Sequence, residues 1–370
     1  MISGRGRSVT NCDRFPGRDP LISSVPAETR VARAHFAVVV VYFGPLPKWM
    51  NLHLATCAAN PDVDWVILSD HPCPPRPPNV HLFPMSLQHF RALARERLGM
   101  PVAIETPYKI CDFKPAFGVI LDEYLRRYDF WAHSDLDICW GRIRRFITDA
   151  DLHQYDIISA APYQICGHFT LYRNDSGVNN LFRANGEHQR VFQEPKHLGF
   201  DEIGEGMRLE GFTSTILELQ RRGDVRVTWR PLALERSISP TWADGLTQLH
   251  RGRIEPTTLF RYQPVTRCYL HAGRVLTIPR NSEVMYFHFR NWGSNWPAVP
   301  GSEATTTRRW ILLSPTSATV HSTLFGLLPS HLDRWVTGAR LSAAWLARTA
   351  FRRLRTSVRR LASFGGLSRQ

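Results

Sequence analysis

Hydrophobic residues in the first half of the chain form short runs that alternate with helical patterns. Residues 36–43 are a continuous β-branched and aromatic run that ends at Gly44, which is typical of a strand buried on both faces. Residues 47–60 then form a helical pattern that opens with proline and stops before Pro61, and the next apolar run is 65–69. Strand, helix and strand in this order predict a right-handed crossover between parallel strands.

The alternation continues along the chain and becomes mixed after Trp140. We expect a strand at 80–83, an amphipathic helix over 87–98, a helix that starts at Asp112 with Pro115 in its first turn, and a strand at 128–133. Beyond Trp140 we expect strands at 155–159, 169–173, 225–229 and 284–289, a helix at 212–222 and a hairpin at 269–278. The sequence therefore predicts an α/β fold with a mostly parallel central sheet flanked by helices.

The same pattern divides the chain into one main domain and two tails. Of its 370 residues 43% are hydrophobic and 21% charged, which is enough to bury a large core. Residues 1–34 are rich in Arg, Ser, Gly and Pro without periodicity, which indicates a disordered leader. We expect the globular domain over 35–313 and a helical basic extension over 314–370.

The net charge of +14 is concentrated in that extension. From Arg334 to Arg369 there are nine arginines and no acidic residue, and 341–361 has a basic amphipathic helical pattern. Such a helix suits an anionic membrane surface; the alternative is a solvated helix packed on the domain, or an extension without a specific role. Nucleic-acid binding is not expected, because the basic tail has few interleaved aromatic residues beyond Phe351 and Phe364 and no nucleic-acid module is recognisable in the core.

Cysteine usage and hydropathy bear on the compartment. The seven cysteines are scattered, odd in number and without paired spacing, which fits a reducing cytoplasm. The sequence has no apolar stretch of about 20 residues that could span a bilayer. We therefore expect a cytoplasmic protein, which the basic helix would hold at the inner face of the plasma membrane if that helix binds lipid.

Acidic residues in an Asp-x-Asp spacing occur at three places, and their position relative to the strands separates them. In an open α/β sheet, ligands bind beyond the carboxyl ends of the strands. Only Asp135 and Asp137 follow a buried strand. The pair at 62 and 64 precedes its strand, and the pair at 149 and 151 lies where a helix start uses a capping carboxylate. The alternative for Asp135 and Asp137 is a polar turn at a strand end.

Two neighbouring carboxylates suit a hard divalent cation such as Mn²⁺ or Mg²⁺. Such an ion stabilises charge on a diphosphate leaving group and orients it. His288, in the segment Tyr286–Arg290, is the best candidate for a third ligand, and Arg290 could reach a phosphate oxygen. The alternative for His288 is a histidine merely packed in a strand.

At this point the sequence resembles a known family, the bacterial polysaccharide-biosynthesis proteins of GT-A fold, many of them of unknown function. The resemblance covers roughly residues 36–290. It lies in the segments Lys109–Pro115, Tyr128–Asp137, Gly141–Phe146, Gly167–Asn174, Asp201–Glu202 and Tyr286–His288. It implies a GT-A-like nucleotide-diphospho-sugar transferase fold, a nucleotide-sugar donor bound over the first half of the sheet, and an acceptor held by the second half.

The resemblance also implies roles for particular residues. Tyr42, Phe43 and Gly44 would line the nucleotide, Asp70 would reach its base or ribose, and Asp112 with Lys114 would meet the donor sugar or diphosphate. Simpler alternatives are a helix cap for Asp112 and a solvated lysine for Lys114.

Asp201 or Glu202 would act as general base on an acceptor hydroxyl if transfer inverts the sugar, and the sequence does not choose between them. The alternative is a solvated acidic loop. Inverting and retaining mechanisms both stay open.

Together these observations predict a metal-dependent glycosyltransferase that moves a sugar to a saccharide or lipid-linked acceptor in cell-envelope polysaccharide biosynthesis. The alternative is a non-catalytic GT-A module that binds glycans or partners at the membrane, because a fold does not determine a function. A nucleotidyltransferase is less favoured, since a glycine-rich phosphate loop ending in lysine does not follow the first strand.

Overall fold

The computed structural model describes most of the predicted globular domain. The described residues are 33–72, 74–204, 210–235, 246–250, 253–257, 267–278, 282–296, 310–314 and 317–321. The predicted leader over 1–34 and the predicted helix over 341–361 therefore lie outside the described residues, apart from the last positions of the leader. Within the described ranges, no helix combines the length and the apolar composition needed to cross a membrane.

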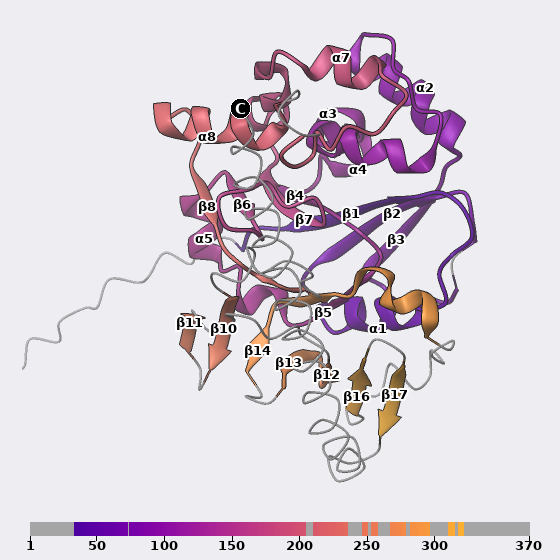
Figure 1. Ribbon diagram of the computed structural model, residues 1–370, viewed down its shortest axis with the longest axis vertical. Helices are drawn as coiled ribbons and strands as arrows, with labels where there is room; N and C mark the ends of the chain where they lie inside the picture. Colours follow the sequence, from indigo (N-terminus) through magenta and orange to yellow (C-terminus); the bar gives the residue numbers. More distant parts are fainter. Residues whose placement is uncertain are drawn as a thin grey trace, which may run out of the picture. The chain divides into compact units, whose positions relative to one another are not determined.

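A seven-stranded sheet forms the centre of the fold (Figure 1). Its strand order is β3-β2-β1-β4-β7-β6-β8, and neighbouring strands are parallel except where β7 pairs with β4 and β6. The predicted α/β class with a mostly parallel sheet is confirmed. The strands are β1 (Phe36–Tyr42), β2 (Asp64–Ser69), β3 (Val80–Pro84), β4 (Phe130–Ser134), β6 (Ile157–Ser159), β7 (Phe169–Arg173) and β8 (Val227–Trp229).

Helices connect and cover these strands. The α-helices are α1 (Met50–Ala58), α2 (Leu87–Leu98), α3 (Phe117–Ile120), α4 (Asp122–Leu125), α5 (Asp149–Gln154), α6 (Ser176–Asn179), α7 (His188–Gln193) and α8 (Phe212–Arg222). The 3₁₀ helices are η1 (Pro107–Ala116), η2 (Ile143–Arg145), η3 (Leu181–Ala184) and η6 (Arg290–Asn295). The helix predicted to start at Asp112 is instead the end of η1 followed by α3 and α4. Pro115 has no amide hydrogen to donate within a helix, which disfavours a continuous α-helix there.

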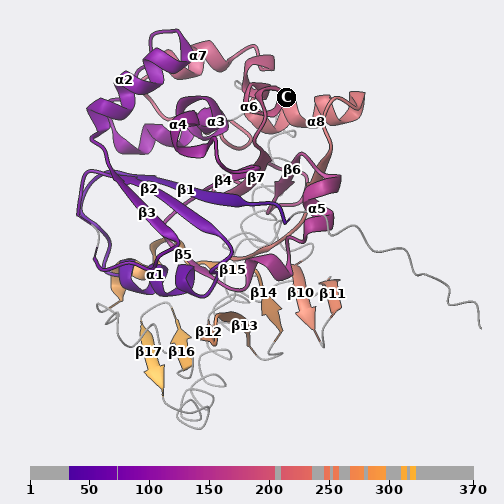
Figure 2. The ribbon, with the colours of Figure 1, turned by 180° about the vertical axis from the view of Figure 1, so that it is seen from behind.

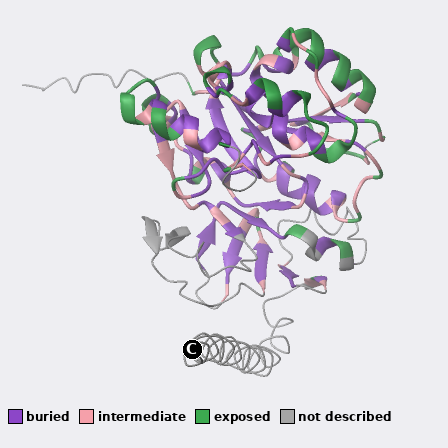
Figure 3. Ribbon diagram, turned by 45° about the horizontal axis from the view of Figure 1, so that its top comes forward, coloured by how far each residue is buried: buried purple, intermediate pink, exposed green. Residues whose placement is uncertain are grey.

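Strand β1 is buried on both faces, as its apolar run predicts. Ala37 and Val39 pack with Phe90 of α2 on one face, whereas Phe36 and Val38 pack with residues of α1 and of β5 (Ile138–Trp140) on the other. Figure 2 shows α2, α3, α4 and α7 on one side of the central sheet and α1 with β5 on the opposite side. The purple core strands in Figure 3 lie between these layers.

Two further sheets are formed by strands of the second half of the chain together with β5. The larger has the order β11-β10-β14-β13-β12-β16-β17, and a small one has the order β5-β15-β9. Their remaining strands are β9 (Ala233–Glu235), β10 (Leu246–His250), β11 (Arg253–Thr257), β12 (Cys268–His271), β13 (Arg274–Thr277), β14 (Glu283–Val284), β15 (Tyr286–His288), β16 (Trp310–Leu313) and β17 (Ala318–His321).

The predicted hairpin over 269–278 is confirmed as β12 and β13. It turns at Ala272 and Gly273, which both have positive φ as this tight turn requires. The single strand predicted over 284–289 is two strands, because the chain passes at Met285 from the larger sheet to the small one. Strand β17 pairs with β16, so sheet structure continues past the boundary expected at residue 313.

Candidate metal and donor site

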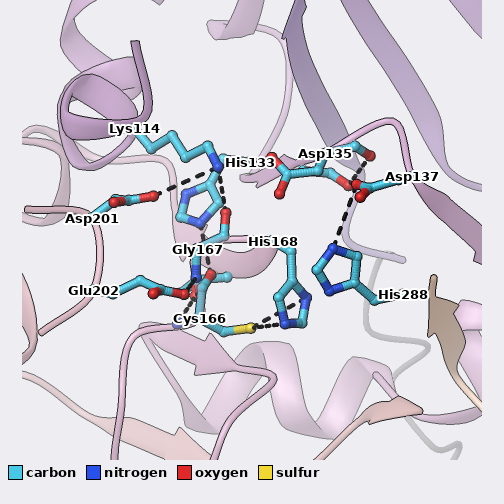
Figure 4. A network of polar contacts seen from close by, with 12 residues as sticks. Lys114, His133, Asp135, Asp137, Cys166, Gly167, His168, Asp201, Glu202 and His288 are labelled. Carbon is cyan, nitrogen blue, oxygen red and sulfur yellow. Dashed lines mark hydrogen bonds and ion pairs between the residues drawn. The ribbon is translucent and has the colours of Figure 1, made fainter. Parts of the chain in front are cut away.

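The acidic pair lies directly beyond the carboxyl end of β4, as predicted. Asp135 and Asp137 flank Leu136, which is 4% exposed and packed in the core below the sheet. The Leu136 carbonyl accepts a hydrogen bond from Trp49 Nε1 at 3.1 Å. Because Leu136 is anchored in the core, the turn that carries the two carboxylates is held in place. Figure 4 shows the two carboxylates close together.

The other two Asp-x-Asp pairs have structural roles, as predicted. Asp64 begins β2 at the opposite edge of the sheet and accepts a hydrogen bond from the Tyr128 hydroxyl at 2.8 Å. Asp151 and Thr148 form a capping box at the start of α5. The carboxylates of Asp64 and Asp151 are therefore already used by the fold.

His288 is brought to the acidic pair by the small sheet. Strand β15 is antiparallel to β5 with His288 opposite Ile138, and the Phe289 amide donates to the Asp137 carbonyl at 3.1 Å. His288 Nε2 lies 3.5 Å from Asp137 Oδ1. Three ligand atoms, one each from Asp135, Asp137 and His288, lie within 4.8 Å of one another. This spacing and these donor types fit Mn²⁺ or Mg²⁺.

The buried Lys114 binds the Asp135 member of this cluster. Its ammonium donates to Asp135 Oδ1 at 2.8 Å and to the Gly167 carbonyl at 2.6 Å, and lies 3.6 Å from Asp201 Oδ2 (Figure 4). Burial alone would raise the pKa of Asp135, but the Lys114 charge, with His288 and His168, outweighs burial and lowers it. The Asp135 carboxylate is therefore ionised, as metal binding requires.

Asp112, in contrast, is an internal residue. It is fully buried, and its carboxylate accepts hydrogen bonds from Lys109 Nζ at 2.7 Å and from the amides of Leu198 and Phe200. This corrects the prediction that Asp112 meets the donor: its carboxylate fixes the loop before Asp201. Asp112, His197 and Asp201 form a second group with metal-ligand spacing, but the buried Lys109 ammonium already balances Asp112.

The two candidate bases differ in their surroundings. Asp201 is 5% exposed and lies between Lys114 and His197, whose Nε2 is 3.9 Å from Asp201 Oδ1. Glu202 accepts a hydrogen bond from the Gly167 amide at 2.9 Å. Burial, with the charge of Asp201 beside it, raises the pKa of Glu202. Both carboxylates therefore reach the Lys114 and Gly167 region, as Figure 4 shows.

The predicted nucleotide-side residues lie at the same edge, after β1 and β2. The Gly44 amide donates to Asp70 Oδ1 at 2.9 Å, and this bond, followed by that from His71, lowers the pKa of Asp70. Burial and the charges of Asp137 and Asp70 raise the pKa of Tyr42, so its hydroxyl lies in the field of both carboxylates. Phe43 is 6% exposed and packs on Phe90, which corrects its predicted contact with the nucleotide.

A sequence profile described as "family of unknown function (DUF6625)" matches residues 38–307, which include every residue of this site. The chain belongs to this family. A comparison with curated proteins gave no match for the DUF6625 chain.

Solved structures with partial similarity to the DUF6625 chain include glycosyltransferases. Mouse xyloside xylosyltransferase 1 in its apo form matches with 10% identity and a TM-score of 0.33, over 57% of this chain and 89% of that one. The galactosyltransferase LgtC, solved with donor and acceptor sugar analogs, matches with 11% identity and a TM-score of 0.34, over 69% of this chain and 87% of that one. The bifunctional glycosyltransferase WbbM, in its apo form, matches with 10% identity and a TM-score of 0.30, over 56% of this chain and 40% of that one. These likenesses are partial and say nothing about the substrate of this chain.

Sequence reasoning gave no individual role to several residues that line the DUF6625 site. The His168 ring lies 4.2 Å from the His288 ring, and its Nδ1 is 2.8 Å from the Tyr286 hydroxyl. His133 Nε2 contacts the Cys166 carbonyl at 2.9 Å, and burial lowers the pKa of His133 to about 3, so this ring is neutral. These residues lie in or beside segments that carry the family resemblance, but only the packing shows that they support His288 and the loop at 166–168.

Arg290 lies two residues after the end of β15 and is exposed, with φ of 49°. It adjoins Phe289, whose amide bonds to Asp137, so its backbone lies beside the acidic pair. Its predicted contact with a phosphate oxygen stays a prediction.

Proposed function

We propose that this protein is a metal-dependent glycosyltransferase of GT-A type that uses a nucleotide-sugar donor. The observation that carries the proposal is the group formed by Asp135, Asp137 and His288 at the carboxyl edge of the sheet, with ligand atoms within 4.8 Å of one another. Ligand sites of open α/β sheets lie at this edge. The strand order, with β1 and β4 adjacent and parallel at the centre, supports the same placement.

Asp135, Asp137 and His288 are the residues that would hold Mn²⁺ or Mg²⁺. When bound, such an ion stabilises the charge that develops on a diphosphate leaving group. The chain orients these ligands itself: Lys114 holds Asp135, the Phe289 amide holds the Asp137 backbone, and the His168 ring packs against His288. Ligands held in this way lose little freedom on binding an ion.

The donor nucleotide is placed by the loops after β1 and β2. The Asp70 carboxylate accepts a hydrogen bond from the Gly44 amide, which links the loop after β1 to the loop after β2. Burial, followed by the charges of Asp137 and Asp70, raises the pKa of Tyr42. A ribose or base over Gly44 and Asp70 therefore has its diphosphate directed toward Asp137, and Arg290 is the arginine that we propose for a phosphate oxygen.

We favour Glu202 over Asp201 as general base in an inverting reaction. Asp201 is already engaged by Lys114 at 3.6 Å and by His197, so its carboxylate oxygens have partners within the chain. Burial, with the charge of Asp201, raises the pKa of Glu202, which makes Glu202 a stronger proton acceptor than an ordinary glutamate. On this basis Glu202→Gln should abolish transfer, whereas Asp201→Asn should retain part of it; the opposite order would reverse the assignment.

A thermal-shift panel tests the donor site directly. UDP, GDP, CDP and TDP are each added with and without Mn²⁺. One nucleotide should stabilise the fold only with the metal, by about 2.7 kcal/mol at a hundredfold excess over its Kd. Asp137→Asn should remove the shift. The matched control is Asp62→Asn, which changes an exposed member of another acidic pair and should keep it.

A metal-independent response, or one that survives Asp137→Asn, would contradict the metal site. Slow, metal-dependent hydrolysis of the matching nucleotide sugar would then establish catalysis. Nucleotide binding without hydrolysis or transfer would support a non-catalytic module instead.

We extend the proposal to a saccharide or lipid-linked acceptor in cell-envelope polysaccharide biosynthesis, on the family resemblance of the sequence. Attachment of the 341–361 segment to the inner face of the plasma membrane belongs to the same proposal, and that segment lies outside the described residues. Flotation with anionic liposomes should recover the full chain and lose a chain cut before Arg340. Equal recovery would remove the membrane part.

A further inference from the structure

Two of the large apolar side chains that the described residues leave exposed lie beside the acidic loop of the site. Tyr108, in the first turn of η1, is 68% exposed, and Ile203, directly after Glu202, is 57% exposed. Scattered exposed hydrophobic residues are ordinary on protein surfaces. An exposed aromatic ring at the mouth of a charged site is different, because ligand sites combine apolar surface with a few polar groups.

A short chain of contacts joins Tyr108 to the candidate metal ligands. The ring centroids of Tyr108 and His197 are 4.5 Å apart, and His197 Nε2 lies 3.9 Å from Asp201 Oδ1. Asp201 Oδ2 lies 3.6 Å from Lys114 Nζ, which donates to Asp135 at 2.8 Å. The Tyr108 ring therefore lies on the Asp201 side of the site, with His197 between Tyr108 and Asp201.

His197, which contacts the Tyr108 ring, is itself held in place by the protein. Its Nε2 lies 3.6 Å from Oδ1 of the buried Asp112. Asp112 is itself fixed by Lys109 and by two backbone amides. One side of the Tyr108 ring rests on this framework, while the high exposure of Tyr108 leaves ring surface open to solvent. A preorganised aromatic face binds with little loss of entropy.

We infer that Tyr108 is the platform for the acceptor, and that the acceptor places a pyranose ring on it. This inference rests on the proposed glycosyl transfer. The face of an aromatic ring is electrostatically negative and attracts polarised C–H groups. A pyranose offers a face of axial C–H groups for the ring and hydroxyls at its edge for His197 and the carboxylates.

The charges around Tyr108 favour a neutral sugar over an anionic ligand. The charged groups that follow His197 along the contact chain are Asp201, Lys114 and Asp135, and two carboxylates against one ammonium disfavour a phosphate or carboxylate group at this position. An alkyl chain would gain contact with the ring but would offer no hydrogen bond to the nearby polar groups. A sugar offers C–H groups to the ring and hydroxyls to the polar groups.

Saturation-transfer NMR tests this with the full chain, Mn²⁺ and the stabilising nucleotide. The probes are methyl glycosides of glucose, galactose, mannose and N-acetylglucosamine. At least one should receive saturation mainly on the protons of one ring face. Tyr108→Ala should weaken its binding about tenfold, which corresponds to about 1.4 kcal/mol. Tyr108→Phe keeps the ring face and should stay within about twofold of the wild type.

The matched control is Leu217→Ala, which removes another exposed apolar side chain, on α8, and should bind like the wild type. The inference is overturned if no glycoside receives saturation, or if Tyr108→Ala binds as well as the wild type. Tyr108-dependent binding to vesicles of anionic phospholipid would also overturn it, in favour of a lipid surface. The metal-dependent nucleotide shift should persist in Tyr108→Ala, which shows that the variant is folded. Its absence from the wild type would be a failure of the proposed function instead.

Discussion

Replacing Lys114 by methionine removes the ammonium between Asp135, Asp201 and the Gly167 carbonyl. Methionine keeps most of the apolar stem and deletes the charge. Removing one partner of a buried ion pair costs about 3–5 kcal/mol, because the remaining charge is left uncompensated. The Asp135 side chain is 36% exposed, so water screens its share of the charge, whereas the Asp201 side chain is only 7% exposed. His197 compensates part of the Asp201 charge, and we therefore expect a loss of about 3 kcal/mol, at the low end of that range.

Urea denaturation at pH 7 measures this loss. The matched control is Lys48→Met, which changes an exposed lysine and should lie within about 0.5 kcal/mol of the wild type. Adding Asp201→Asn to Lys114→Met should recover part of the loss, because it removes the uncompensated charge. If Lys114→Met is as stable as Lys48→Met, the buried ion network does not hold the site together.

The loss should also depend on pH in a defined direction. The folded-state pKa of Asp135 is lowered from 3.8, so its contribution to stability is complete above that value and is lost as the pH falls through the folded value. The pKa of Lys114 is raised well above 10.5, so its contribution is complete below that value and is lost only at higher pH. The stability difference between Lys114→Met and the wild type should therefore be constant near neutral pH and shrink in acid.

Three further predictions concern single residues. The arginines beside Asp156 outweigh its burial and lower its pKa from 3.8 to about 2, so Asp156→Asn should cost about 2 kcal/mol in urea denaturation at pH 6 and almost nothing at pH 2. Burial lowers the pKa of His53 from 6.5 to about 4, so as the pH falls the unfolded chain binds a proton at His53 before the folded chain does. The wild type should therefore lose about 3 kcal/mol of folding stability between pH 6.5 and 4, and His53→Gln should lose less. Melting temperatures measured across that pH range test this. In Gly167→Ala, the added Cβ would lie 2.8 Å from Glu202 Oε1 and 2.9 Å from Asp201 Oδ2. Both carboxylates are buried and held, Asp201 by Lys114 and Glu202 by the Gly167 amide, so they can make room only by shifting from these partners. We expect a lower melting temperature and about a hundredfold slower sugar transfer, measured with the nucleotide sugar that the thermal-shift panel identifies; unchanged transfer would contradict their placement in the site.

Local patterns predicted the central elements well. The apolar run of β1, the helical stripe of α2 and the cap of α5 each depend on residues only a few positions apart. Ser86 accepts the His89 amide at the start of α2, and Gly99 ends it in the left-handed conformation. Where local signals competed, prediction was less accurate: Pro115 disfavoured a continuous helix, and the apolar run at 284–289 belongs to two different sheets.

The sequence by itself determined that Asp135 and Asp137 stand at the ligand edge of the sheet. Both follow a buried parallel strand, and parallel strands end at one edge whatever their neighbours are. It also determined that the other acidic pairs serve the fold, since one precedes its strand and the other begins a helix.

Only the tertiary structure decided what surrounds the pair. Strand β7 runs antiparallel to β4, so Gly167 and His168, which precede a strand, reach the edge where other strands end. The small sheet sets His288 beside Asp137, and the burial of Lys109 turns Asp112 inward while Lys114 faces the site. These contacts join residues far apart in the chain, and their energies depend on strand direction and burial, which local sequence patterns do not encode.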